Sequence, residues 1–220
     1  MSKKACIIIV VGVEEMEVLT LLNILRRAGL EVIVAGLWGD ISVKCKNKLV
    51  ILPDKSLESI KDIDFDIIIL PGGIPATKAM QDSELLAEVL RKQEKKKRYI
   101  ATMGTSTIVL EHHAIMKGKN VTSDPKYKTI MCRGGYNYNE KSNVVKDGNL
   151  ITSAGLGTTM EFALRIACIF TEPGNTKFST PYLESNEQDI ITPGGTHLEE
   201  YPPASSALGT FNEKDTSNVT

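Results

Sequence analysis

The sequence predicts an α/β protein in which helices cover both faces of a mostly parallel sheet. Short apolar runs rich in β-branched residues alternate along the chain with longer stretches of helical periodicity, which is the order of strand–helix–strand units. The strand candidates are apolar at successive positions, as in Cys6–Val11, and this pattern is typical of strands buried on both faces. No run approaches the roughly 20 apolar residues of a membrane-spanning helix, so no membrane association is expected.

The first half of the chain contains one clear amphipathic helix among several strand candidates. Residues Glu15–Ala28 place apolar side chains at helical spacing, and Gly29 is well suited to end that helix. Glu31–Ala35 is the second strand, and Val43–Leu52 is a strand or a hairpin. Asp66–Leu70 is another buried strand, closed by a Pro-Gly-Gly turn.

The second half continues the alternation of helix and strand. Asp82–Lys95 is a helix with Ser83 near its start, followed by a strand at 99–103 and a helix at 105–113. The remaining predicted elements are short strands at Asn120–Thr122, Val144–Lys146 and Leu150–Thr152, and a long helix at Thr158–Phe170. Strands and helices in this order predict a parallel sheet with crossover helices.

The composition divides the chain into a folded domain at 1–173 and a tail at 174–220. The tail carries seven acidic residues against two lysines, and four prolines without apolar periodicity, so we expect an acidic, disordered segment. The formal net charge of the whole chain is −1, which gives no electrostatic reason to expect specific binding of nucleic acid. The four cysteines show no C-x-x-C spacing, so no metal site is expected.

Residues Tyr99–Leu110 are the most informative segment, because they predict a strand, a tight turn and a helix in immediate succession. In enzymes this geometry holds a nucleophile above the N-terminus of the helix. The turn residue is Gly104, which has no side chain. Thr105 and Ser106 follow it and are candidate replacement nucleophiles, but both are weak without a base. Capping of the helix is the simpler role for them.

Three segments of the chain, GVEEMEV, DFDIIILPGG and KDGNLITS, closely resemble the DJ-1 branch of the DJ-1/PfpI superfamily in order and spacing. The resemblance extends from about Lys3 to Phe170 and implies a flavodoxin-like sandwich without a cofactor. It also implies a dimer and a lineage that acts in oxidative-stress response and in defence against reactive carbonyls such as methylglyoxal. That activity is described as glyoxalase or protein deglycase activity.

The resemblance also implies roles for individual residues. The family's reactive cysteine corresponds to Gly104 and its nearby histidine to Asp124, so both members of the usual pair are replaced. The acidic partner of that cysteine corresponds to Glu17, whose simplest role without a thiol is a buried acid bonded to the glycine backbone. The family's oxyanion site corresponds to the backbone of Gly72, Gly73 and Thr105. We therefore expect a retained pocket for a small carbonyl compound or an anion.

Two of the four cysteines are candidate redox thiols. Cys45 corresponds to a family cysteine near the dimer surface, and the neighbouring lysines would lower its pKa if it were exposed. Cys132 precedes a loop that lies near the family's pocket. We expect Cys6 in a core strand and Cys168 on a core-facing helix to be inert.

Two hypotheses for function differ in the fate of the catalytic chemistry. In the first, the chain is a pseudoenzyme that acts by binding or regulation, as a homodimer or as a heterodimer with a cysteine-bearing paralogue. In the second, the chain is an active glyoxalase, deglycase or hydrolase. Its nucleophile is then Ser106, Thr105 or Cys132, assisted by Glu17 or Asp124. The sequence shows no targeting signal, so cytoplasmic localisation is expected, with the nucleus and mitochondria as further compartments of the family.

Overall fold

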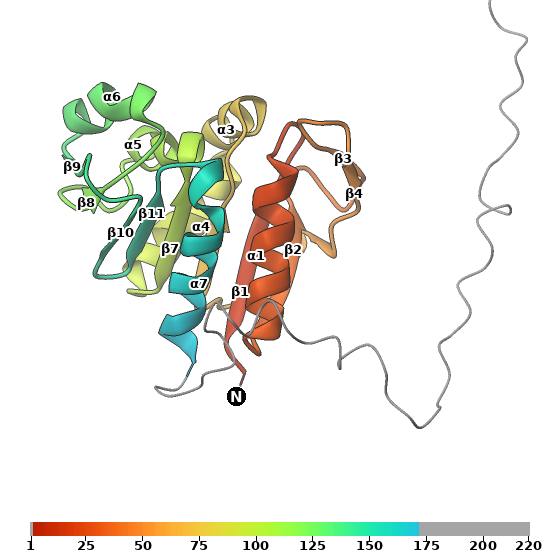
Figure 1. Cartoon of the computed structure of the whole chain (residues 1–220). Helices are drawn as coiled ribbons and strands as arrows, with labels where there is room; N and C mark the ends of the chain where they lie inside the picture. The colour runs from red at the N-terminus through yellow and green to blue at the C-terminus, as the bar shows by residue number, and fades with distance from the viewer. Residues whose placement is uncertain (1, 172–220) are drawn as a thin grey trace, which may run out of the picture. The chain divides into compact units, whose positions relative to one another are not determined.

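A seven-stranded sheet forms the centre of the computed structural model, which describes residues 2–171 (Figure 1). In the order β10-β11-β7-β6-β1-β2-β5, every pair of neighbours is parallel except β10 and β11. The strands are β1 (Lys4–Ile9), β2 (Glu31–Gly36), β5 (Lys55–Ser56), β6 (Ile67–Leu70), β7 (Tyr99–Met103), β10 (Val144–Asp147) and β11 (Leu150–Ser153). The predicted tail at 174–220 and the domain boundary at 173 lie outside the described residues.

Helices cover both faces of this sheet, as predicted. α1 (Glu15–Arg27) and α7 (Thr159–Phe170) pack side by side in front of it in Figure 1, and α4 (Glu84–Lys95) lies behind it against β7. The other helices are α2 (Leu57–Ile60), α3 (Ile74–Gln81), α5 (Ile108–His112) and α6 (Lys128–Arg133). None of the helices in the described part of the chain is long and apolar enough to cross a membrane.

Two predicted segments gain detail from the structure. Val43–Leu52 is a hairpin, in which β3 (Val43–Lys44) pairs antiparallel with β4 (Val50–Ile51). The predicted helix at 105–113 begins instead as a 3₁₀ turn at Gly104–Thr107, and α5 follows that turn. The strand, turn and helix succession expected around Gly104 is therefore confirmed.

Several short elements escaped prediction. Helix α3 has eight residues and α6 has six, so neither completes enough turns to show a helical pattern of apolar residues. Strand β8 (Asn120–Val121) confirms the short strand predicted at Asn120–Thr122, whereas its partner β9 (Asn137–Tyr138) was not predicted. The two pair with each other outside the main sheet. These elements take their conformation from the surrounding fold rather than from local periodicity.

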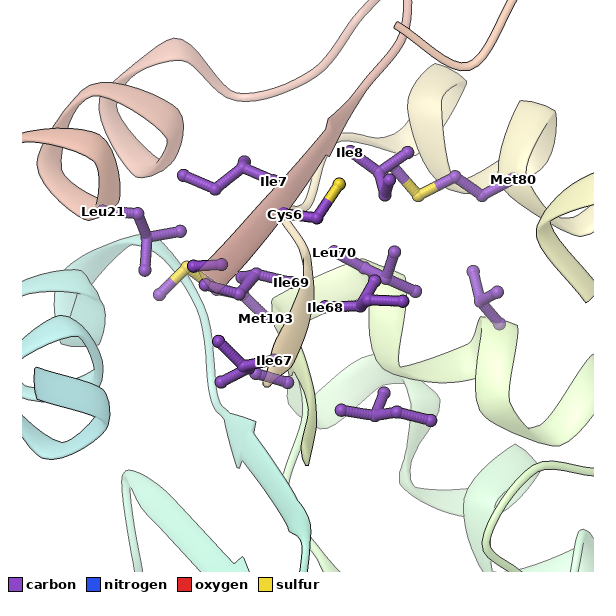
Figure 2. Packing of buried hydrophobic residues seen from close by; sticks show 14 of the residues in the cluster. Cys6, Ile7, Ile8, Leu21, Ile67, Ile68, Ile69, Leu70, Met80 and Met103 are labelled. Atoms are coloured by element: carbon purple, nitrogen blue, oxygen red, sulfur yellow. The ribbon is translucent and has the colours of Figure 1, made fainter. Parts of the chain in front are cut away.

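The side chains of the central strands form two apolar layers, one on each face of the sheet (Figure 2). One layer contains Ile7, Ile67 and Ile69 with Leu21 and Met103, and the other contains Cys6, Ile8, Ile68 and Leu70 with Met80. Successive strand residues point to opposite faces, and both faces are covered. The central strands are therefore apolar at successive positions, from Ala5 to Ile9 in β1 and from Ile67 to Leu70 in β6.

The order of the strands reverses between β1 and β6. From β1 the sheet continues to β2 and β5, whereas from β6 it continues in the opposite direction to β7 and β11. In open parallel sheets, ligands bind at the carboxyl ends of the strands beside such a reversal, where the connecting loops diverge. The glycines Gly12, Gly72, Gly73 and Gly104 follow β1, β6 and β7 at this edge. The candidate site therefore lies where the topology favours a crevice.

Candidate functional site

A cavity of about 170 Å³ opens at the carboxyl ends of the central strands. It brings together six residues that the sequence assigned to the site: Glu17, Gly72, Gly73, Gly104, Thr105 and Asp124. Its wall also includes the lysines Lys46 and Lys126 and the apolar side chains Ile74 and Leu156. Segments that are far apart in the sequence thus meet at one point.

Gly104 occupies a sharp turn between β7 and the 3₁₀ turn that precedes α5. Its φ of +56° lies in the left-handed region, where a residue with a Cβ is strained. A Cβ placed there would lie 3.2 Å from the Cα of Gly155, which is a tight approach. The backbone N–H of Asp124 donates to the Gly104 carbonyl oxygen at 3.3 Å, so these two positions are neighbours.

Glu17 brings a buried carboxyl group to the cavity. It lies in the first turn of α1, and its Oε2 accepts a hydrogen bond from the Gly72 N–H at 2.5 Å. Burial raises the pKa of Glu17 to about 7, and the nearby Glu14 carboxylate adds to this effect, whereas the Gly72 N–H and Lys46 oppose it. Glu17 therefore changes its charge near neutral pH.

The two N–H groups of the Gly72–Gly73 turn are both bonded within the protein. Gly72 donates to Glu17, and Gly73 donates to Thr105 Oγ1 at 2.9 Å. Thr105 Oγ1 also shares a hydrogen bond with Thr77 Oγ1 at 2.8 Å. Only glycine fits at 73, because its φ is +117° and a Cβ would lie 2.2 Å from a backbone carbonyl oxygen. An anion could accept from these N–H groups only after Glu17 or Thr105 moved away.

A family model matches most of the described chain: the one for the DJ-1/PfpI family covers residues 3–168. This chain belongs to the DJ-1/PfpI family. It is 46% identical over 167 residues to Protein dj-1beta from Drosophila melanogaster, and the alignment covers 76% of this chain and 89% of that protein. The DJ-1 branch that the sequence segments indicated is therefore confirmed.

Two further similarities extend this result to a named enzyme and to a solved structure. The Caenorhabditis elegans protein called Glutathione-independent glyoxalase DJR-1.2 is 37% identical over 163 residues, which span 74% of this chain and 86% of that protein. The crystal structure of Drosophila melanogaster DJ-1beta superposes with a TM-score of 0.77 at 40% identity. The superposition covers 87% of this chain and 100% of the DJ-1beta chain. This similarity confirms the predicted DJ-1-like fold.

Ser106 and Thr105 are the candidate replacement nucleophiles of this DJ-1 family member, and both of their hydroxyl groups are hydrogen-bonded within the protein. Ser106 is fully buried, where its Oγ donates to the Leu70 carbonyl oxygen at 2.6 Å and accepts from the Met103 N–H at 3.1 Å. Thr105 lines the cavity but is bonded to Gly73, as described above. Among the described residues that line this cavity there is no histidine to act as a base.

The charged groups of the cavity are largely paired. Asp124 Oδ1 accepts from the Lys126 N–H at 3.0 Å and caps the 3₁₀ turn Pro125–Tyr127. Lys46 Nζ donates to Glu14 Oε2 at 2.8 Å. No cluster of three or more possible metal ligands occurs within residues 2–171.

Among the residues at the site that no sequence motif indicated are Thr77, which contacts Thr105, and Lys46, which lines the cavity. Thr77 lies on α3, a helix without a clear pattern, and Lys46 lies in the turn between β3 and β4. Lys46 is one of several lysines in its segment, and Thr77 lies between Ala76 and Lys78, so the sequence marks neither residue. Only their positions in the folded chain distinguish them from surface residues.

The cysteines require two corrections. Cys45 is buried, and burial together with two nearby glutamate carboxylates raises its pKa to about 11, so the neighbouring lysines do not activate it. Cys168 is exposed on α7, whereas a core-facing position was predicted. Cys132 is exposed on α6 but does not line the cavity, and Cys6 is buried in β1 as expected.

Proposed function

We propose that this chain is a DJ-1 family protein of the oxidative-stress and reactive-carbonyl lineage that lacks cysteine-dependent glyoxalase and deglycase chemistry. In this proposal it acts as a binding or regulatory homologue. The observation that supports it is Gly104: the turn that borders the cavity at the end of β7 carries no side chain. The glyoxalase name of the Caenorhabditis elegans relative supports the lineage.

Cysteine-dependent chemistry on an aldehyde begins when a thiolate attacks the carbonyl carbon. That step needs a sulfur atom at the cavity, and none of the four cysteines lines the described cavity wall. Cys45, on the hairpin nearby, remains protonated at neutral pH because its pKa is raised to about 11. Glu17 can exchange a proton there, but it has no nucleophile to assist.

The test is the consumption of methylglyoxal by the purified protein beside a Gly104→Cys variant. We expect the wild-type chain not to exceed the rate in buffer. We expect measurable turnover by the variant, because the turn, the buried acid and the cavity are already present. Gly104→Ser is the matched control, since it carries the same backbone strain and a similar side-chain volume without the thiol. It should stay inactive.

Turnover by the wild-type chain would contradict the proposal and favour the second hypothesis, an enzyme with relocated machinery. In that case Cys132→Ser and Thr105→Ala would identify the nucleophile, because each removes one candidate atom. The geometry gives this hypothesis little support, since Ser106 is enclosed and Cys132 lies outside the cavity wall.

We also propose that the chain associates as a homodimer or with a cysteine-bearing paralogue. Large apolar side chains on the outer side of α1 support an interface, because Met16 is 60% exposed and Leu19 is 46% exposed. Sedimentation of the chain alone and mixed with the paralogue would distinguish the two. Localisation in the cytoplasm, with the nucleus and mitochondria as further compartments, is proposed on the family resemblance alone.

A further inference from the structure

Thr105 places its hydroxyl group where the oxygen of a ligand would meet the Gly73 N–H. Both residues line the cavity, and the N–H donates to Thr105 Oγ1 at 2.9 Å. A Cβ built on Gly72 would also lie only 3.3 Å from that oxygen, so the hydroxyl group lies close to both glycines of the turn. A backbone donor that faces a cavity is normally available to a ligand. Here the protein supplies the acceptor itself.

Thr77 holds this hydroxyl group in position. It is buried on α3, its N–H donates to the Gly73 carbonyl oxygen at 2.8 Å, and its Oγ1 lies 2.8 Å from Thr105 Oγ1. A hydroxyl group has one donor and two acceptor sites, so bonds to Gly73 and Thr77 fix the Thr105 rotamer. The Gly-Gly turn, the Gly104 turn and α3 are thereby joined in one closed network.

We infer that Thr105, positioned by Thr77, closes the Gly73 N–H to ligands and so weakens the binding of small neutral carbonyl compounds, which gain no hydrogen bond from this donor. A carbonyl oxygen that approached Gly73 would find no free donor and would meet the Thr105 oxygen instead, an arrangement that disfavours binding. The inference rests on the proposed function, since a protein that performs no chemistry on carbonyls has no need of a free donor here.

The charges of the cavity wall determine the choice of probe. The wall includes three carboxyl groups, those of Glu14, Glu17 and Asp124, and two lysines. An anionic probe would therefore respond to the charge of Glu17 as well as to Thr105. Hydroxyacetone is neutral and small, and the amide resonance of Gly73 reports whether its carbonyl oxygen reaches this donor.

The experiment is a titration of full-length, ¹⁵N-labelled protein with hydroxyacetone, followed through the amide resonance of Gly73. Thr105→Ala removes the hydroxyl group and leaves space beside the N–H, whereas Thr105→Ser keeps the hydroxyl group and is the matched control. We expect the Gly73 resonance to shift saturably with hydroxyacetone concentration in Thr105→Ala. The affinity for hydroxyacetone should be at least about fivefold higher than in the wild type, because one neutral hydrogen bond contributes about that factor. Thr105→Ser should behave like the wild type.

Equal responses of Gly73 in all three proteins would overturn the inference, and so would an absence of binding to Thr105→Ala. Thr77→Val is a second, nearly isosteric variant in case Thr105→Ala fails to fold. It frees the Thr105 rotamer, so the Gly73 N–H should exchange with solvent faster than in the wild type, and unchanged exchange would also overturn the inference. Turnover of methylglyoxal by the wild type would refute the proposed function without altering these readings.

Discussion

The chemistry of Glu17 and the conformation of Gly104 both depend on their immediate surroundings. The carboxyl group of Glu17 is enclosed and receives one N–H donor, so its pKa rises to about 7. The backbone of Gly104 adopts a positive φ that glycine takes without cost and other residues do not. The cavity thus contains a group that exchanges a proton near neutral pH, beside a turn that has no nucleophile.

The pKa of Glu17 predicts a dependence of stability on pH. The folded protein keeps a proton that the unfolded chain releases, so stability falls as pH rises from the ordinary pKa of 4.5 to the folded value of about 7. Glu17→Gln keeps an acceptor for the Gly72 N–H but cannot ionise. We compare the free energy of unfolding of Glu17→Gln with that of the wild type at each pH. We expect this difference to shift in favour of the variant between pH 5 and pH 8, by at most about 3 kcal/mol.

Urea unfolding at the two pH values measures this difference. Glu58→Gln is the matched control, because Glu58 is an exposed acid on α2 whose replacement should change stability equally at both pH values. If Glu17→Gln differed from the wild type by the same amount at pH 5 and pH 8, the proposed protonation of Glu17 would be wrong.

Single elements are decided by a mixture of local and distant interactions. Helix α4 begins where the sequence indicates, because Ser83 Oγ accepts from the Leu86 N–H at 3.2 Å. The hairpin of β3 and β4 depends instead on α1, since the Asn47 N–H donates to the Glu15 carboxylate at 3.0 Å. Local signals therefore locate α4, whereas the position of the hairpin requires its contact with α1.

The cap of α4 can be tested by substitution. We expect Ser83→Ala to lower the free energy of unfolding by about 1 kcal/mol, since it leaves the Leu86 N–H without its side-chain acceptor. Ser83→Asp should restore most of the loss, because its carboxylate can accept the same hydrogen bond. Chemical denaturation of the three proteins measures the effect, and equal stabilities for alanine and aspartate would rule out a capping role.

At the scale of the whole molecule, the fold sorts the four cysteines by accessibility. Cys6 lies in the central strand and Cys45 in the segment that joins β3 to β4, both buried, whereas Cys132 and Cys168 are exposed on α6 and α7. Burial also raises the pKa of both enclosed thiols. The accessible thiols are therefore found on outer helices rather than at the cavity.

Alkylation with iodoacetamide tests this arrangement. Under native conditions we expect rapid modification at Cys132 and Cys168 only, because thiolate formation requires contact with water. In denaturant all four cysteines should react. Peptide mass spectrometry identifies the sites, and a double variant, Cys132→Ser with Cys168→Ser, should remain unmodified in the native state. Rapid native modification of Cys45 would contradict its enclosed position.

The sequence by itself determined the α/β class, the main strands and the helix α4. These features depend on apolar runs, helical spacing and a capping serine, which are local patterns. It also identified six of the residues that line the cavity, through the resemblance of short motifs. Their meeting at the carboxyl ends of β1, β6 and β7 follows from the parallel topology, in which those ends share one edge.

Only the tertiary structure decided which groups in the cavity are hydrogen-bonded within the protein. The bonds from Gly72 to Glu17, from Gly73 to Thr105 and between Thr105 and Thr77 join residues that are 55, 32 and 28 positions apart. The burial of Cys45 and the exposure of Cys168 were likewise invisible to local patterns. The physical reason is that hydrogen-bond partners and burial depend on the packing of distant segments, and no periodicity in the chain encodes that packing.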